Sequence, residues 1–420
     1  MPVQLRIAAV VVLATVAACS DAAPAGGPTI DPSGDAASDI DVSAPADDGT
    51  GLLVWTDAGT VEVLRAVAAA FTTATDVAVT IEEVDIDEVR GEILGAGTTG
   101  RTPDVFVGEH VWAGDLVESE LVVPVVLDAA RGQFMSVALQ AFHVDGDLYA
   151  VPATVESMAM YRNTDLVADA PGTWDELVTA CESALVDTCV AVPGGTGDPD
   201  AYAQFVFLSA FGGFVFGYDD ATGFDAASVG IDAASTIDGA EFLERQVGAG
   251  VIPDTGYVEA RRRFIDGEAA FWLSGPWELA ELAETEIPFE VSSIPRMSGE
   301  PARPFVGATG WYVSANSMQA ALAASFLTDH VATDDTMREF VVAGVVDSAW
   351  SAVARSLPER DPARAFVESA EAGVAIPNIV AVAEVWGPLG ERLEQLRRGE
   401  LDATDALTRA ADDVRTATNG

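Results

Sequence analysis

Short apolar runs alternate with amphipathic segments over the region that follows residue 50. Residues 51–55, 77–84 and 103–108 have the length and apolar content of strands. Residues 61–71 and 87–94 lie between them and carry apolar side chains at spacings of three and four, which is typical of helices. This alternation predicts a parallel sheet covered by helices on both faces.

In such a sheet, functional side chains are expected just beyond the carboxyl ends of the strands. Asp57 follows the first predicted strand, and Glu109 follows the third. Both are therefore candidate binding residues. Asp57 is equally suited to capping the next helix, because an Asp carboxylate accepts hydrogen bonds from the free amides of a first helical turn. Glu109 has the same two interpretations.

Glu156 lies within a mostly apolar run, residues 148–163. An ionised carboxylate that leaves water needs an ion pair or a polar ligand to offset its lost hydration. Arg162 is close enough in sequence to be a structural partner. The two interpretations of Glu156 are therefore a ligand contact and an internal ion pair.

The N-terminal segment has the features of an export signal. Arg6 precedes an apolar run over residues 7–16, which is too short for a stable membrane span, and small residues lead to Cys19. The segment resembles a bacterial lipobox, which implies cleavage after residue 18 and a diacylglyceryl group on Cys19. Residues 19–50 are rich in Ala, Gly, Pro, Ser and Asp and predict a flexible acidic tether. The alternative is a soluble secreted protein.

Composition excludes several functions. The formal net charge of −46 opposes binding to nucleic acid or to anionic lipid. The chain has no Lys, so it has neither a Walker lysine nor a Schiff-base lysine, and we expect no cofactor. His110, His143 and His330 are far apart in sequence, so we expect no metal site. Cys181 and Cys189 predict a disulfide in an exported protein, with free thiols as the alternative.

Four segments occur in the order and approximate spacing found in one family. They are PDVFVGEHVWAGDLVESELVVPV, DGDLYAVPATVESMAMYRNTDLVADAPGTWDELV, FIDGEAAFWLSGPWEL and IPNIVAVAEVW. From about residue 51 onward, the chain resembles the extracellular solute-binding proteins of ABC importers, family 1, and within it the maltose and oligosaccharide group. The resemblance implies an α/β, two-lobed periplasmic-binding-protein fold of type II, with discontinuous lobes, a hinge and a ligand cleft between the lobes.

We place the chain crossings between the lobes near Thr154, Pro304 and Val346. The expected organisation has four parts, which are a signal peptide over residues 1–18, a lipidated Cys19 and linker over 19–50, an N-terminal lobe of 51–154 plus 305–346, and a C-terminal lobe of 155–304 plus 347–420.

The resemblance also assigns candidate ligand contacts. It directs Glu156 into the cleft, where its oxygens would accept hydrogen bonds from sugar hydroxyls. Flat rings stack on the apolar face of a pyranose, and acids meet its polar edge. Trp112, Trp277 and Trp386 match aromatic positions of the sugar-binding pattern. Tyr202 is a further platform, and Trp311 is suited either to the cleft or to a core.

The expected function is capture of a maltodextrin-like sugar or oligosaccharide and its delivery to an ABC permease. The protein would act as a monomer without turnover, exported and anchored by lipid to the outer face of the cytoplasmic membrane. One alternative is a secreted glycoside hydrolase, which also combines aromatic residues with paired acids. The other is an importer subunit that binds a cation or polyamine.

Overall fold

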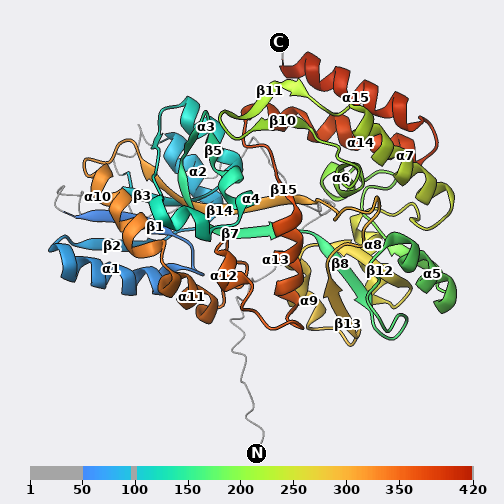
Figure 1. The fold of residues 1–420 in the computed structure, drawn as a ribbon, viewed down its shortest axis with the longest axis horizontal. Coiled ribbons are helices and arrows are strands. Elements are labelled where there is room, and N and C mark those ends of the chain that lie inside the picture. The colour runs from blue at the N-terminus through green and yellow to red at the C-terminus, as the bar shows by residue number, and fades with distance from the viewer. Residues whose placement is uncertain (1–50, 96–101, 419–420) are drawn as a thin grey trace, which may run out of the picture.

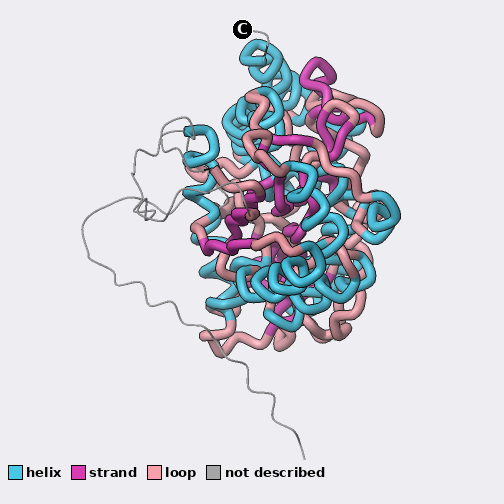
Figure 2. Tube along the Cα trace, turned by 90° about the vertical axis from the view of Figure 1, so that its left-hand side faces the viewer, coloured by secondary structure: helices cyan, strands magenta, loops and turns pink. Residues whose placement is uncertain are grey.

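The computed structural model describes residues 51–95 and 102–418, which form two lobes connected by strands that pass between them (Figure 1). Cys19, the predicted signal peptide and the predicted tether lie outside the described residues. Figure 2 shows most strands in the middle of the molecule with helices around them, and further strands near its upper edge. Within the described ranges, no helix is both long enough and apolar enough to cross a membrane.

The first lobe is built on a mixed sheet with the strand order β15-β14-β3-β1-β2, and β4 and β7 also pair with β14. The strands at residues 51–55, 77–84 and 103–108 are confirmed as β1, β2 and β3, and β1 pairs with both neighbours in parallel. β14 returns antiparallel to β3 and β7. The strands are β1 (Leu52–Thr56), β2 (Val79–Glu83), β3 (Val105–Glu109), β4 (Val122–Val123), β7 (Ala150–Ser157), β14 (Phe305–Ser314) and β15 (Val374–Ala375).

Helices cover this sheet because each has one apolar face. In α1, Leu64, Val67 and Phe71 are buried at spacings of three and four, and the helix ends at Asp76 in a left-handed conformation. The two helices predicted from periodicity are confirmed as α1 and α2. The helices are α1 (Val61–Thr75), α2 (Ile86–Gly95), α3 (Ala113–Glu118), α4 (Ser136–Ala141), α10 (Ala320–Ser325), α11 (Asp334–Ala343), α12 (Ser351–Ala354) and α13 (Pro362–Ala372). A short hairpin of β5 (His143–Val144) and β6 (Asp147–Leu148) follows α4.

The second lobe contains a four-stranded sheet with the order β13-β8-β12-β9, together with the hairpin β10-β11. Its strands are β8 (Ala159–Asn163), β9 (Thr188–Ala191), β10 (Phe216–Asp219), β11 (Gly223–Val229), β12 (Ala269–Ser274) and β13 (Phe289–Ser292). Its helices are α5 (Trp174–Ala184), α6 (Ala201–Ser209), α7 (Ala234–Gly248), α8 (Tyr257–Ile265), α9 (Leu279–Leu282), α14 (Trp386–Arg397) and α15 (Ala403–Thr418).

The first lobe has one apolar core and the second lobe has two. Apart from Phe366 of α13, which packs in the smaller core of the second lobe, the chain passes from the core of one lobe to that of the other at three places. Val155 belongs to the first core and Met158 to the second. Phe305 belongs to the second core, whereas the next residue, Val306, belongs to the first. The last passage falls after Ala375. β7, β14 and the segment after β15 therefore form the connections between the lobes.

The third passage of the chain between the lobes does not occur near Val346, where we expected it. After Val346 the chain pairs with β7, since Asp347 accepts a hydrogen bond from Val155 N at 2.8 Å. The Trp350 ring then packs edge-on against Phe134, with ring centroids 4.9 Å apart. These contacts keep the chain in the first core for about thirty further residues, and α13 packs against both lobes.

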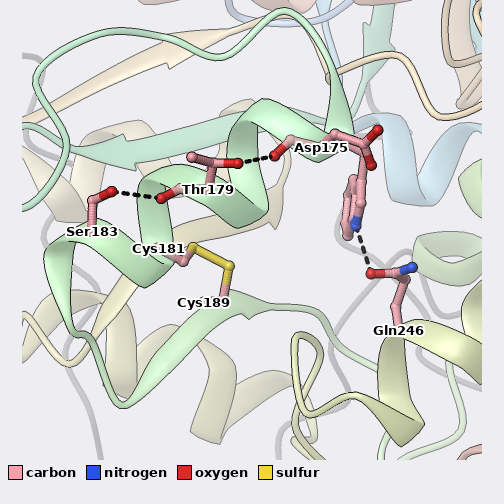
Figure 3. The surroundings of a disulfide bond; sticks show 7 residues. Asp175, Thr179, Cys181, Ser183, Cys189 and Gln246 are labelled. Atoms are coloured by element: carbon pink, nitrogen blue, oxygen red, sulfur yellow. Dashed lines mark hydrogen bonds between the residues drawn. A yellow bond between two sulfur atoms is a disulfide. The ribbon is translucent and has the colours of Figure 1, made fainter.

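A disulfide joins Cys181 of α5 to Cys189 of β9, which confirms the predicted pairing (Figure 3). It closes a loop with a sequence separation of 8 residues. α5 starts at a capping box in which Thr173 and Glu176 satisfy each other's backbone amides. The disulfide and the cap fix the two ends of one helix on the outer side of the second lobe.

We predict that replacing Cys181 and Cys189 together with Ser lowers the free energy of unfolding by about 2–3 kcal/mol, because the cross-link restricts the unfolded chain. Urea denaturation followed by circular dichroism measures this change. Reducing agent should destabilise the native protein and leave the double variant unaffected. Equal stability of the oxidised and reduced native protein would contradict the prediction.

Candidate functional site

Strand ends of the first lobe place several carboxylates close together. Asp57 follows β1 and Glu109 ends β3, and these two strands are parallel neighbours. Glu109 lies opposite Thr309 of β14, and Thr309 lies opposite Thr154 of β7. Side chains two residues apart on a strand share a face, so Glu156 lies on the same face as Thr154. Glu109 and Glu156 therefore project from the same side of the sheet.

Asp347 joins this group from the other edge of β7. Ser348 forms an isolated bridge with Thr154, and the backbone of Asp347 bonds to Val155. We name Asp57, Glu109, Glu156 and Asp347 the acidic wall. All four are partly exposed.

Glu156 has no hydrogen-bond or ion-pair partner among the described residues. The ion pair with Arg162 that the sequence left open is not formed, because the Arg162 guanidinium instead pairs with Glu290 and donates to Ala168 O at 2.9 Å. Arg162 is also 3% exposed. Of the two interpretations of Glu156, the internal ion pair with Arg162 is excluded, and the ligand contact stays a prediction.

The environment of three carboxyls of the acidic wall, those of Glu109, Glu156 and Asp347, favours their protonated form. Burial raises the pKa of Glu156 to about 7, with further contributions from the charges of Asp347 and Glu109. Burial likewise raises the pKa of Asp347 to about 6, with a further contribution from Asp57. The pKa of Glu109 is raised by burial and then by Asp87, against the opposing effects of Arg90 and Trp112. A ligand that donates hydrogen bonds would relieve this unfavourable burial.

Asp57 shapes the turn before α1, whereas the N-cap position itself is Thr60. The role of Asp57 as a ligand contact stays a prediction. Its carboxylate accepts hydrogen bonds from the amide of Gly59 at 2.8 Å and the amide of Thr60 at 3.2 Å. The turn before α1 therefore depends on it. The side chain is still partly exposed, and its charge acts on Asp347.

The second lobe contributes a row of aromatic rings. Tyr202, at the start of α6, is 6.4 Å from Trp277 and stacks on Phe305 at 6.2 Å between centroids. Phe305 in turn meets the ring of Trp386 edge-on at 5.7 Å. We name Trp277, Tyr202, Phe305 and Trp386 the aromatic wall. Phe305 is 2% exposed, whereas the other three are partly exposed.

A hydrogen-bonded chain fixes the indole of Trp277. Its Nε1–H donates to the hydroxyl of Tyr257 at 2.9 Å, and that hydroxyl donates to Glu278. Arg261 donates to the other oxygen of Glu278 at 3.0 Å. Glu278 is 3% exposed, so its charge is matched inside the protein by Arg261. A ring held in this way loses little side-chain entropy when a ligand stacks on it.

The two walls interact with each other across the lobes. Burial raises the pKa of the Tyr202 phenol well above its ordinary value, and the largest charge contribution comes from Glu156. The strand register gives the geometry: Glu156 lies opposite Gly307 of β14, and Phe305, two residues back on the same face, carries the ring on which Tyr202 stacks. This places Glu156, which has no internal partner, beside the partly exposed rings.

Two of the predicted aromatic contacts lie mainly inside the first lobe. Trp311 is fully buried, stacks on Phe340 at 5.4 Å and donates to Thr56 Oγ1 at 3.2 Å. Its assignment as a ligand contact is therefore wrong, because its ring fills the core under the sheet. Trp112 is 7% exposed and bonds to the carboxylate of Glu109.

Sequence reasoning missed three residues of the site. Asp347 is next to the crossing expected at Val346, and the signal that could have identified it is an acid close to apolar residues, as for Glu156. Phe305 was treated as a strand residue, and Tyr257 gave no local signal, because its partner Trp277 is distant in sequence.

The described residues contain no group of His, Cys, Asp or Glu that could hold a metal ion. Cavities of about 780 and 630 Å³ lie away from the two walls, and neither is lined by any predicted ligand contact. We therefore define the candidate site by the facing side chains.

We predict that Glu156→Gln stabilises the ligand-free protein at pH 8. A carboxyl whose pKa is raised on folding contributes stability that is fully present below pH 4.5 and is lost as the pH rises to about 7. The gain should be about 1–3 kcal/mol at pH 8 and close to zero at pH 4.5. Chemical denaturation at both pH values measures it. Glu290→Gln is the control and should stabilise at neither pH, because it leaves the buried Arg162 unpaired.

Comparison with known proteins identifies the family of the chain. Residues 66–365 match the bacterial extracellular solute-binding protein family. The chain is 25% identical over 376 residues to the galactooligosaccharide-binding protein of Bacillus subtilis (strain 168), covering 87% of this chain and 88% of the relative. It is 25% identical over 392 residues to the maltooligosaccharide ABC transporter solute-binding lipoprotein of Streptococcus pneumoniae (strain ATCC BAA-255 / R6), covering 87% and 89%.

Solved structures confirm the two-lobed periplasmic-binding-protein fold. A cyclo/maltodextrin-binding protein complexed with maltotetraose aligns with a TM-score of 0.77 and 22% identity, covering 88% of this chain and 97% of that one. An extracellular solute-binding protein from Staphylococcus aureus in complex with maltose gives the same TM-score and identity, covering 88% and 98%. The match over residues 66–365 also separates the chain from glycoside hydrolases, since it is to a family of binding proteins. The chain is a member of the bacterial extracellular solute-binding protein family.

Proposed function

We propose that this protein is the extracytoplasmic binding subunit of an ABC importer and that it captures a sugar or oligosaccharide of the maltodextrin type. The observation that carries the proposal is the position of Glu156, which has no internal partner and lies on the same face of the sheet as Phe305, the ring on which Tyr202 stacks. The sugar would bind between the acidic wall and the aromatic wall and would then be delivered to a membrane permease.

The chemistry of the two walls suits a sugar. Carboxylates accept strong hydrogen bonds from hydroxyl groups, and aromatic rings stack on the C–H face of a pyranose. The named relatives bind galactooligosaccharide or maltooligosaccharide, and one of the aligned structures contains maltotetraose. The proposed contacts are Asp57, Glu109, Glu156, Asp347, Tyr202, Trp277 and Trp386. Trp112, which is largely buried, is a further proposed contact at the edge of the site.

A ligand that binds between walls of different lobes would link ligand binding to the closure of the lobes. A ligand that contacts both lobes has a higher affinity for the closed form and shifts the population toward it. The permease would then recognise the closed monomer. Affinity near micromolar, about 8 kcal/mol, is enough for capture and still permits release.

One observation favours a second cargo. The acidic wall has four carboxylates, and Arg90, whose charge acts on Glu109, is paired with Asp115. A cation or polyamine would neutralise such a wall. The aromatic wall favours the sugar, and spermidine belongs in the same binding screen as maltooligosaccharides.

We predict that Trp277→Ala weakens binding of maltotetraose between twofold and about tenfold, because one stacked ring contributes about 0.5–1.5 kcal/mol beyond its buried area. Isothermal titration calorimetry of the native protein and the variant measures the change. Trp174→Phe alters a buried indole of the same lobe, which bonds to Gln246, and should leave the affinity unchanged. If the protein bound spermidine tightly and bound no sugar, the proposed sugar cargo would be wrong and the second cargo would be supported.

The same samples test for turnover. Maltotetraose incubated with the protein should be recovered intact, and new reducing ends would contradict a binding role.

We also propose that a lipid on Cys19 anchors the exported protein to the outer face of the cytoplasmic membrane. The Streptococcus pneumoniae relative is named a lipoprotein, and stable anchoring requires two or more acyl chains. Cys19→Ala should move the protein from the membrane fraction to the soluble exported fraction, as followed by immunoblotting. Retention of this variant in the membrane fraction would contradict lipid attachment at Cys19.

A further inference from the structure

The edge of β14 changes partner at the boundary between the lobes. At Phe305 and Val306 it pairs with β15, and from Thr309 onward it pairs with β3. Ala308 lies between these stretches and opposite neither strand. Its amide would need another acceptor, because an unpaired buried backbone N–H costs about as much as a lost hydrogen bond.

The imidazole of His110 fills this gap. Ala308 N–H donates to Nδ1 at 3.1 Å, and Nε2 lies 3.1 Å from the carbonyl oxygen of Ile376. The ring is 2% exposed. One side chain thus connects β14 to the segment that follows β15, and these are two of the three connections between the lobes.

The direction of the two hydrogen bonds fixes the tautomer. Nδ1 also lies 3.3 Å from the Ala308 carbonyl oxygen. Only with the proton on Nε2 do both the Ala308 amide and the Ile376 carbonyl have a partner in the ring, so Nδ1 accepts from Ala308 and Nε2 donates to Ile376. Burial lowers the pKa of His110 to about 4, so the ring is neutral at neutral pH and keeps this arrangement.

The same turn carries two proposed ligand contacts. His110–Trp112 is a single 3-10 turn, preceded by Glu109, and Trp112 bonds back to that carboxylate. Beyond Ile376, the side chain of Asn378 donates to Ala141 O at 2.8 Å and His143 O at 3.1 Å and is 1% exposed. The last connection is therefore fixed to the first lobe through Asn378, and it reaches Trp386 only after that.

We propose that His110 is a positioning residue that couples the turn bearing Glu109 and Trp112 to two of the connections between the lobes, at Ala308 and Ile376. The coupling to ligand binding rests on the proposed function. A displacement of the turn by a bound ligand would be passed through the ring to the backbone that links the lobes, and the ring would limit the orientations available to the empty protein.

Three substitutions of His110 distinguish its hydrogen bond to Ala308 from its hydrogen bond to Ile376. His110→Phe keeps the ring shape and removes both hydrogen bonds. His110→Asn keeps an acceptor near the position of Nδ1, and His110→Gln keeps a donor near the position of Nε2. His330→Asn is the control, because His330 packs against Phe71 of the same lobe at 5.0 Å and contacts neither connection.

Hydrogen exchange and spin-label distances test the coupling without any ligand. We expect the Ala308 amide to exchange at least tenfold faster in His110→Phe and at close to the native rate in His110→Asn. Spin labels on Val342→Cys and Val258→Cys, one on each lobe at exposed positions, should give a broader distance distribution in His110→Phe than in the native protein. His330→Asn should change neither quantity, even if its melting temperature falls.

Titration with maltotetraose tests the link to binding. We expect His110→Phe to bind at least tenfold more weakly than the native protein, and the Asn and Gln variants to lie between them. Native exchange, native distances and an affinity within twofold of native in His110→Phe would overturn the inference. If the native protein binds no sugar, the proposed cargo fails, and the exchange and distance measurements still decide whether His110 couples the connections.

Discussion

The carboxylate of Glu156 is the constraint on which the proposed site depends. It lies on a strand that joins the lobes, beside two other acids, and no described cation pairs with it. The nearby Arg162 is occupied by Glu290 and by backbone carbonyls. A half-buried acid kept in this way lowers the stability of the empty protein at neutral pH, which is a common cost of a binding site. A hydrogen-bond donor from outside the protein would offset that cost.

The first lobe contributes acids and the second lobe contributes aromatic rings, because different elements of each lobe reach the boundary between them. Strand ends of the first lobe bring acids from β1, β3 and β7 to one side of a sheet. The second lobe presents rings from the starts of α6 and α14 and from the turn after β12. Trp277 is held by Tyr257, which is oriented by Glu278. Apart from Trp112, the proposed aromatic contacts come from the second lobe and the proposed acidic contacts from the first, so a ligand that used both sets would bridge the lobes.

Local periodicity was enough to predict the first three strands and the first two helices, because each has one clear apolar face or a short apolar run. The resemblance supplied the two lobes. Sequence reasoning failed where a contact joins distant segments. Trp311 is paired with Thr56, 255 positions away, and so belongs to a core. The last crossing falls after Ala375 because Trp350 packs back on Phe134. The roles of Asp347 and Phe305 depend on strands that pair across the boundary between the lobes. The local sequence therefore did not predict them.

A crystal structure of the protein grown with maltotetraose tests the central claim most directly. The account predicts one sugar chain between the lobes, with a hydroxyl within about 3 Å of the Glu156 carboxylate and a pyranose face against Trp277. A structure in which the sugar binds elsewhere, or in which Glu156 instead pairs with an Arg of the protein while the sugar is bound, would contradict it.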